Sequence, residues 1–235
     1  MARKPNSKQC AGMLKWLWTF PAKLEVGLIS IVLWLAAALT TCNSQPGPYN
    51  IPNPNAGDWA DFGTGIGRGF TGKLSNPFVF PAQTSHQSVN YVYTKAPALA
   101  VGQAITLNYS VDGDATFAPV DINEQPPAIL SLFFWRDGDN LSGQGGYVHY
   151  RWFCSQKVLL QLGDNQTLSC QIAGAKWVSV FGENGANSAA SQAGFAAALK
   201  HAAYAGAASA VNILPGSVWT TSGSAIFTIK SYTIQ

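Results

Sequence analysis

The feature that most constrains the fold is a strict alternation of apolar and polar residues in the middle of the chain. Between Ala104 and Val111 the apolar positions Ile105, Leu107, Tyr109 and Val111 alternate with Thr106, Asn108 and Ser110. Successive side chains of a β-strand point to opposite faces, so this period of two predicts a strand with one buried and one wet face.

Further segments also have the composition of strands. Ile129 to Trp135 is apolar throughout and predicts a central strand covered on both faces. The other predicted strands are 89–94, 146–153, 158–162, 167–172, 176–181, 211–214 and 225–234. About nine short strands separated by turn signals such as Asp112-Gly113 predict an all-β protein, a jelly-roll-like β-sandwich rather than a βαβ fold.

One segment predicts a helix within this β-rich domain. Ser188 to Tyr204 is rich in alanine, begins with a good N-cap residue, and places Phe195 and Leu199 on one face. We expect a single Ala-rich helix, inserted near the C-terminus, that packs over an end or edge of the sandwich.

The first 42 residues have the pattern of an export segment. The uncharged run Val26 to Thr41 follows a basic stretch and is shorter than the ~20 residues of a membrane-spanning helix, which favours a signal-peptide core over a retained signal anchor. Its end, Leu39-Thr40-Thr41-Cys42, resembles the bacterial lipoprotein signal, which implies a bacterial source, acylation of Cys42 and membrane attachment through the N-terminus. Thr41 departs from that signal, and Ala36 to Ala38 offers an ordinary cleavage site instead.

The remaining chain is predicted to comprise a tether and one domain. Residues 43–57 contain four prolines and four asparagines without a hydrophobic period, which predicts a tether, and residues 58–235 form the β-sandwich domain. Cys154 and Cys170 are the cysteines of this domain, and an even pair in an exported protein predicts a disulfide; two buried free thiols are the alternative.

The charge of the chain is concentrated in its N-terminal segment. Five of the 14 basic residues and one of the 11 acidic residues precede residue 43, so the remainder carries nine basic and ten acidic residues, about −1 in net charge. A near-neutral domain does not predict nucleic-acid binding. Charged residues make up only 11% of the chain against roughly 25% in ordinary soluble proteins, which favours export to the outer membrane, periplasm or cell surface.

The best candidate binding cluster follows the apolar strand. Aromatic faces stack on the C–H patches of sugars, and planar Asp, Asn and Arg groups hydrogen-bond paired hydroxyls; the cluster supplies Trp135, Arg136, Asp137, Asp139 and Asn140. The alternative is that the tryptophan ends a core strand and the polar residues only form a turn. The two aspartates could also help to hold Ca²⁺, but the EF-hand spacing is absent, two carboxylates are too few alone, and no other cofactor is indicated.

Two other groups of residues have a similar composition. Trp59 follows Asp58 in an aromatic and acidic group just after the tether, and Tyr147, His149 and Arg151 share one face of a predicted strand. Either group is a candidate lining for a groove.

Common catalytic signatures are missing from the sequence. It contains no G-x-S-x-G elbow, H-E-x-x-H, Walker loop or C-x-x-C, and no pair of histidines has metal-ligand spacing. Glu183 is the better candidate general acid for glycoside cleavage, with an unidentified aspartate as its partner. A solvated turn residue is the alternative for this glutamate.

The closing segment, Gly223 to Ile234, resembles the last strand of carbohydrate-binding jelly-roll modules. The resemblance implies a sandwich that binds sugar on a concave face or loop edge, although the Ala-rich helix departs from such modules. The leading hypothesis is therefore a non-catalytic module that binds a neutral polysaccharide or another envelope component. The alternatives are a structural or assembly protein of the envelope or a surface appendage, and a glycoside-cleaving enzyme.

Overall fold

The computed structural model describes residues 48–52, 58–63, 68–73, 76–79, 90–119, 128–210 and 218–235. Residues 45–235 form one compact unit. The predicted signal segment, Cys42 and the predicted strand 211–214 lie outside the described residues. In the described part of the chain, no helix is both long enough and apolar enough to cross a membrane.

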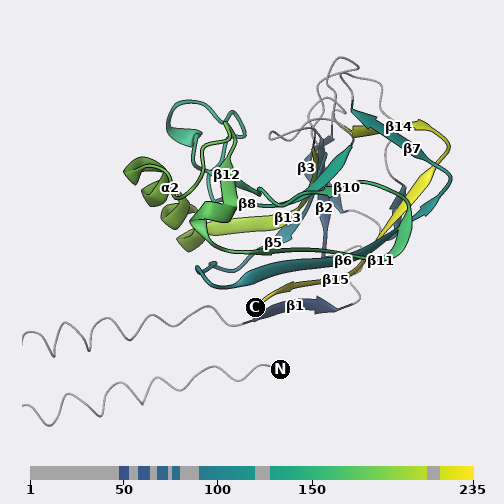
Figure 1. Ribbon diagram of the computed structural model, residues 1–235, viewed down its shortest axis with the longest axis horizontal. Coiled ribbons are helices and arrows are strands. Elements are labelled where there is room, and N and C mark those ends of the chain that lie inside the picture. The colour runs from purple at the N-terminus through teal and green to yellow at the C-terminus, as the bar shows by residue number, and fades with distance from the viewer. Residues whose placement is uncertain are drawn as a thin grey trace, which may run out of the picture. The chain divides into compact units, whose positions relative to one another are not determined.

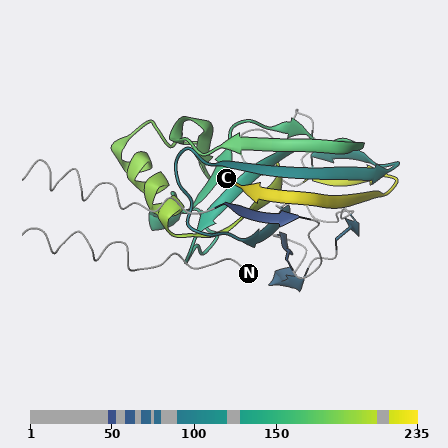
Figure 2. The same cartoon turned by 90° about the horizontal axis from the view of Figure 1, so that it is seen from below.

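The first sheet consists of five antiparallel strands (Figure 2). In spatial order they are β1 (Tyr49–Pro52), β15 (Ala225–Ile234), β6 (Ala104–Gly113) and β11 (Gly163–Gln171), with β4 (Phe78–Val79) also paired to β15. The strand β1 falls in the segment predicted as a tether. It pairs with the last strand of the chain, with Tyr49 opposite Ile234. The four residues of β1 are therefore part of the sheet.

The second sheet has eight antiparallel strands and faces the first (Figure 1). Its order is β12 (Trp177–Ser179), β9 (Arg151–Cys154), β8 (Ile129–Arg136), β13 (Ala202–Ala210), β5 (Asn90–Lys95), β2 (Ala60–Gly63) and β3 (Arg68–Lys73), with β10 (Val158–Leu159) also paired to β8. A separate ribbon pairs β7 (Thr116–Pro119) with β14 (Val218–Ser222). The predicted fold class, an all-β sandwich with one helix, is confirmed.

The core between the sheets follows the predicted alternation. On β6 the side chains of Ile105 and Leu107 are buried while Thr106 and Asn108 are partly exposed. Neighbouring β15 places Phe227 against Tyr109, with the two rings stacked 5.1 Å apart. The alternation therefore positions one face of the five-stranded sheet in the core, as the sequence predicts.

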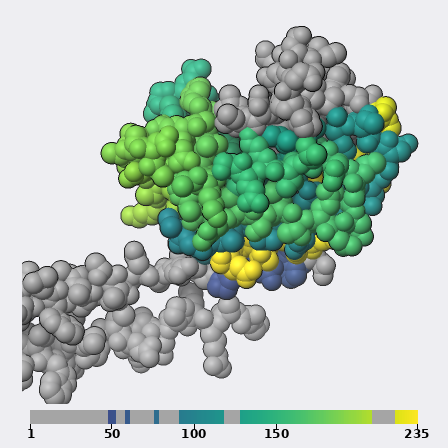
Figure 3. Space-filling view, viewed as in Figure 1, coloured from purple at the N-terminus to yellow at the C-terminus, as the bar shows by residue number. Residues whose placement is uncertain are grey.

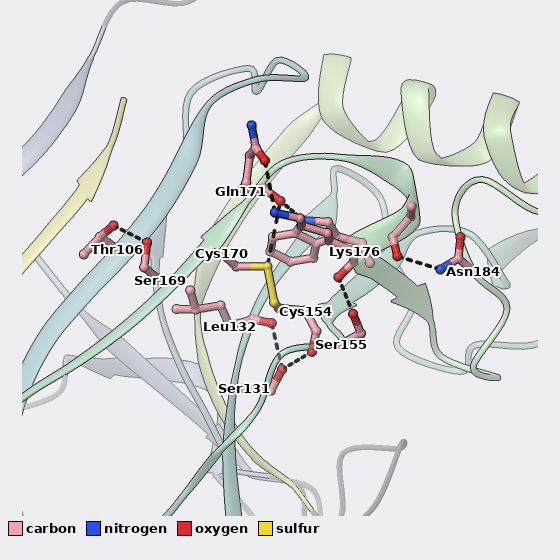
Figure 4. Close-up of a disulfide and its surroundings, with 12 residues drawn as sticks. Thr106, Ser131, Leu132, Cys154, Ser155, Ser169, Cys170, Gln171, Lys176 and Asn184 are labelled. Carbon is pink, nitrogen blue, oxygen red and sulfur yellow. Dashed lines mark hydrogen bonds between the residues drawn. A yellow bond between two sulfur atoms is a disulfide. The ribbon is translucent and has the colours of Figure 1, made fainter.

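The predicted disulfide between Cys154 and Cys170 is confirmed, and it links the two sheets (Figure 4). Cys154 ends β9 in the eight-stranded sheet and Cys170 lies on β11 in the five-stranded sheet, and both are almost fully buried. The hydroxyl of Ser131 donates a hydrogen bond to the Cys154 carbonyl oxygen at 2.9 Å. The disulfide therefore joins the two sheets near the end of the sandwich that carries the helix.

The described residues contain one α-helix, which is shorter than predicted. Helix α2 (Ala189–Lys200) begins at the predicted N-cap, where the Ser188 side chain accepts a hydrogen bond from the backbone N–H of Ser191. The chain then continues as β13, the strand between β8 and β5, where the sequence predicted more helix. Alanine favours helices locally, but packing within a sheet overrides that preference here.

The predicted strand 146–153 is also shorter in the structure. Gly145–Tyr147 forms a 3₁₀ turn, and β9 begins only at Arg151. A second 3₁₀ turn elsewhere in the chain spans Gly174–Lys176. Gly145, the first residue of the first turn, has a φ of +56°, in the left-handed region that favours glycine. The residues before Arg151 therefore form a turn at the end of the sheet.

Candidate functional site

The eight-stranded sheet carries a second group of buried aromatic side chains on the face opposite the inter-sheet core. Leu132 and Phe134 of β8 belong to the inter-sheet core, whereas the alternate residues Phe133 and Trp135 belong to this second group. We call the group the aromatic layer; it comprises Tyr91, Tyr93, Phe133, Trp135, Phe153 and the partly buried Tyr204. Burial on both faces of β8 confirms the prediction of a doubly covered central strand.

The rings of the aromatic layer meet across an intervening strand. β5 and β8 both pair with β13, and strands two positions apart in a sheet are separated by about 9.6 Å. The ring centroids of Tyr93 and Trp135 nevertheless lie only 4.9 Å apart. Gly206 of β13 is the cross-strand partner of both Tyr93 and Phe133, and a Cβ atom there would lie 2.0 Å from the Val92 carbonyl oxygen.

Trp135, the predicted sugar platform, lies inside this layer. Its side chain is 3% exposed, and its ring contacts Tyr93, Phe133 and Tyr204 with centroids 4.9 to 5.2 Å away. The tryptophan therefore ends a buried strand, the alternative weighed from the sequence. Its ring offers no open face to a ligand in this conformation.

Trp59 also lacks an open face. It is 2% exposed, belongs to the inter-sheet core and makes an edge-to-face contact with Tyr232 at 5.2 Å. The prediction that Trp59 lines a ligand-binding groove is therefore corrected, because its side chain is packed into the inter-sheet core.

Arg136 lies beside two partly exposed tyrosines at the end of β8. Its guanidinium carbon is 4.6 Å from the ring centroid of Tyr150, within cation–π range, and that ring lies 4.9 Å from the ring of Tyr147. The backbone N–H of Arg136 donates to the Tyr150 carbonyl oxygen at 2.8 Å. We call these three residues the tyrosine edge; the antiparallel pairing of β8 with β9 brings them together.

Asp139 and Arg151 form a buried ion pair beside the aromatic layer. Arg151 Nε lies 2.7 Å from Asp139 Oδ2, and the two side chains are 7% and 0% exposed. Arg151 also donates to the Leu141 carbonyl oxygen at 2.7 Å and to the Tyr91 hydroxyl at 3.2 Å. Burial raises the pKa of Asp139, and the nearby charge of Arg151 opposes that rise.

The other polar residues of the predicted cluster form the turn itself. Asp137 is exposed, and its backbone N–H donates to the His201 carbonyl oxygen. Asn140 Oδ1 accepts hydrogen bonds from both the N–H and the hydroxyl of Ser142. Within the described ranges, no three His, Cys, Asp or Glu side chains form a group that would hold a metal ion, and the carboxylate of Asp139 is paired with Arg151.

Glu183 belongs to a hydrogen-bonded chain at the start of helix α2. Its two carboxylate oxygens accept from His149 Nε2 at 2.7 Å and from the Ser188 hydroxyl at 2.8 Å. The hydrogen bond from His149, with a smaller contribution from Ser188, lowers the pKa of Glu183. A general acid must hold its proton near neutral pH, so this environment opposes the catalytic role predicted for Glu183.

The structure thus places three polar groups at the end of the sandwich where β8, β9 and α2 meet. These are the tyrosine edge, the Asp139–Arg151 pair and the His149–Glu183 pair. Figure 3 shows the teal-green segment between β8 and β9 projecting at the same end as the yellow-green helix α2. The sequence had indicated residues 135–140 and Tyr147, His149 and Arg151 as separate groups, and the β8–β9 pairing joins them.

Tyr91 and Tyr150 were missing from the sequence-based site. Tyr150 precedes β9, and its link to Arg136 depends on the register that places Trp135 opposite Arg151. Pairing the predicted strands 129–135 and 146–153 as antiparallel neighbours would have indicated this link. Tyr91 comes from β5, two strands away from β8, and no local pattern connects it to Arg151.

The fold and the site define an antiparallel β-sandwich with an aromatic outer layer. No protein-family model and no curated protein matches the chain. Among solved structures, it is similar to a xylan-binding module, CBM15, with 12% sequence identity and a TM-score of 0.37; the match covers 80% of this chain and 95% of that module. A TM-score of this size supports no transfer of fold or ligand.

Proposed function

We propose that this chain is an exported, non-catalytic module that binds a neutral polysaccharide at the tyrosine edge. The observation that carries the proposal is the contact of Arg136 with the partly exposed ring of Tyr150, which in turn lies beside the partly exposed ring of Tyr147. A partly exposed ring presents an apolar face to sugar C–H groups, and the Arg136 guanidinium provides a planar hydrogen-bonding group beside it. The exposed Asn140 lies in the turn that follows β8.

Charge and cysteine chemistry support the same proposal. The residues after position 42 are close to neutral, which suits an uncharged ligand better than a phosphorylated one. The buried disulfide fits an oxidising compartment outside the cytosol. Attachment to a membrane through the N-terminal segment, by acylation of Cys42 or by a retained anchor, is part of this proposal.

The test is binding of the full-length chain to a panel of neutral polysaccharides by affinity electrophoresis and titration calorimetry. Replacing Tyr150 with alanine removes the ring that contacts Arg136, and we expect about fivefold weaker binding, since one well-placed aromatic contact contributes about 1 kcal/mol. The matched control Tyr150→Phe keeps the ring and should bind within about twofold of the parent.

Two results would overturn the proposal. The first is a folded parent chain that binds no member of the panel. The second is unchanged affinity in the Tyr150→Ala variant, with circular dichroism showing that it is folded; this result would exclude the tyrosine edge as the contact surface.

A further inference from the structure

The loop between β8 and β9 is built largely from local contacts. We call residues 138–146 the cover loop; Gly138, Leu141, Gly143 and Gly145 in it have positive φ angles between 56° and 76°. Several of its hydrogen bonds close within two residues, from Leu141 N–H to Asp139 and from Gln144 N–H to Ser142. A segment of this kind keeps its internal turns when it moves as a unit.

Arg151 holds the cover loop against the sheet. It pairs with Asp139 at one side of the loop and donates to the Leu141 carbonyl oxygen at the other, at 2.7 Å in both cases. Gly143 adds close packing, because a Cβ atom placed there would lie 2.8 Å from Val180 Cγ1 and 3.5 Å from Arg151 Nη2. One side chain of the sheet thus makes both polar attachments.

The surface beneath Arg151 is the aromatic layer. The Tyr91 hydroxyl oxygen accepts a hydrogen bond from Arg151 Nη1, and Val180 packs against the same layer. Tyr91 and Phe153 are only 2% and 1% exposed. The two sheets are held together by the hydrophobic core between them. The aromatic layer lies on the outer face of the eight-stranded sheet and is not part of that core.

We propose that the cover loop opens and that the end of the aromatic layer around Tyr91 and Phe153 is then a second binding surface for the same polysaccharide. The inference rests on the proposed function, and it extends the site from the tyrosine edge to the sheet face. The rings of Tyr91 on β5 and Phe153 on β9 lie 6.3 Å apart, and once uncovered they present neighbouring apolar surfaces to a chain of sugar rings. The freed guanidinium of Arg151 and the Tyr91 hydroxyl then bond the sugar hydroxyls.

The test compares two glycine variants of the full-length chain. Gly143→Ala and Gly145→Ala place the same side chain at similar φ angles of +64° and +56°, but only the first meets a neighbour, since nothing lies within 4 Å of a Cβ at Gly145. Val180 is β-branched and stiff, so the Gly143 variant should displace the loop. Hydroxyl-radical labelling read by mass spectrometry reports the exposure of Tyr91 and Phe153, with the core residue Trp152 as the internal control.

We expect about fivefold more labelling of Tyr91 and Phe153 in Gly143→Ala than in Gly145→Ala, with Trp152 unchanged, and faster polysaccharide association. Equal labelling of the two variants would overturn the opening of the loop. Increased labelling with unchanged association, in a chain that binds polysaccharide at the tyrosine edge, would overturn the second surface alone. If no polysaccharide binds the parent, the proposed function and the second surface both fail, and labelling still decides the opening.

A variant that unfolds would label Trp152 as well. In that case Arg151→Lys is compared with the parent by the same labelling. Lysine keeps the positive charge but lacks the planar guanidinium group that contacts Leu141 and Asp139 at the same time. If Tyr91 and Phe153 are labelled to the same extent in this variant and in the parent, the proposed opening of the loop is wrong.

Discussion

Replacing Arg151 with methionine tests the central electrostatic feature of the site. Methionine retains a long unbranched side chain but leaves the fully buried Asp139 carboxylate without its positive partner. The variant also removes the hydrogen bonds to the Leu141 carbonyl and the Tyr91 hydroxyl. Breaking a buried ion pair from one side costs about 3–5 kcal/mol in the free energy of unfolding.

The assay is urea-induced unfolding followed by circular dichroism at pH 7 and pH 4. Burial already raises the pKa of Asp139, and loss of the Arg151 charge, which lowers it, should raise it further. The folded Arg151→Met variant then binds a proton that the unfolded chain releases as the pH rises above about 4, so its stability falls with increasing pH. The loss relative to the parent should therefore be larger at pH 7 than at pH 4.

A double-mutant cycle separates the pair from its surroundings. Asp139→Asn removes the charge but keeps an oxygen that accepts from the Leu141 N–H. Combined with Arg151→Met, it should cost less than the sum of the two single changes, with a coupling of about 1–3 kcal/mol. An Arg151→Met variant within about 1 kcal/mol of the parent at pH 7, or equally destabilised at both pH values, would refute the reasoning.

Three further outcomes follow from the structure. Replacing Cys154 and Cys170 together with serine should destabilise the domain by about 3 kcal/mol, measured by thermal unfolding, because the bond closes a segment with a sequence separation of 16. Gly206→Ala should cost about 2–4 kcal/mol in urea unfolding, since its Cβ would lie 2.0 Å from the Val92 carbonyl oxygen, whereas Gly146→Ala, with open space around it, should be neutral. Glu183 has a lowered pKa, so its contribution to the stability of the fold is present above pH 4.5 and is lost as the pH falls through the lowered pKa. Glu183→Gln should remove this pH dependence, which is measured from unfolding midpoints between pH 6 and about 3.

The strands with a clear period were predictable from the sequence. The alternation of Ile105, Leu107 and Tyr109 predicts a strand with one buried face. The uninterrupted apolar run of Ile129 to Trp135 predicts a strand with two buried faces. Strand β13 was not predictable in this way. Its alanines and Gly206 have no hydrophobic period, and the need for small side chains between the aromatic strands β5 and β8 is visible only once the sheet is assembled.

The candidate site was predictable in composition but not in arrangement. The cluster of Trp135, Arg136 and Asp139 was evident from the sequence, but its partners depend on which strand pairs with β8. Trp135 and Arg136 are adjacent in sequence, yet the pleat places the first in the buried layer and leaves the second partly exposed beside Tyr150. Sequence composition therefore identified the region, whereas the register decided which residue faces solvent.

The contact of rings across Gly206 has a spectroscopic consequence. Aromatic rings held at these separations couple their electronic transitions, so the aromatic layer should produce a strong near-ultraviolet circular dichroism band of its own. Excited Tyr91 and Tyr93 should also transfer energy to Trp135, which quenches tyrosine emission while the layer is intact. These optical signals follow the packing of side chains, separately from the far-ultraviolet signal of the two sheets.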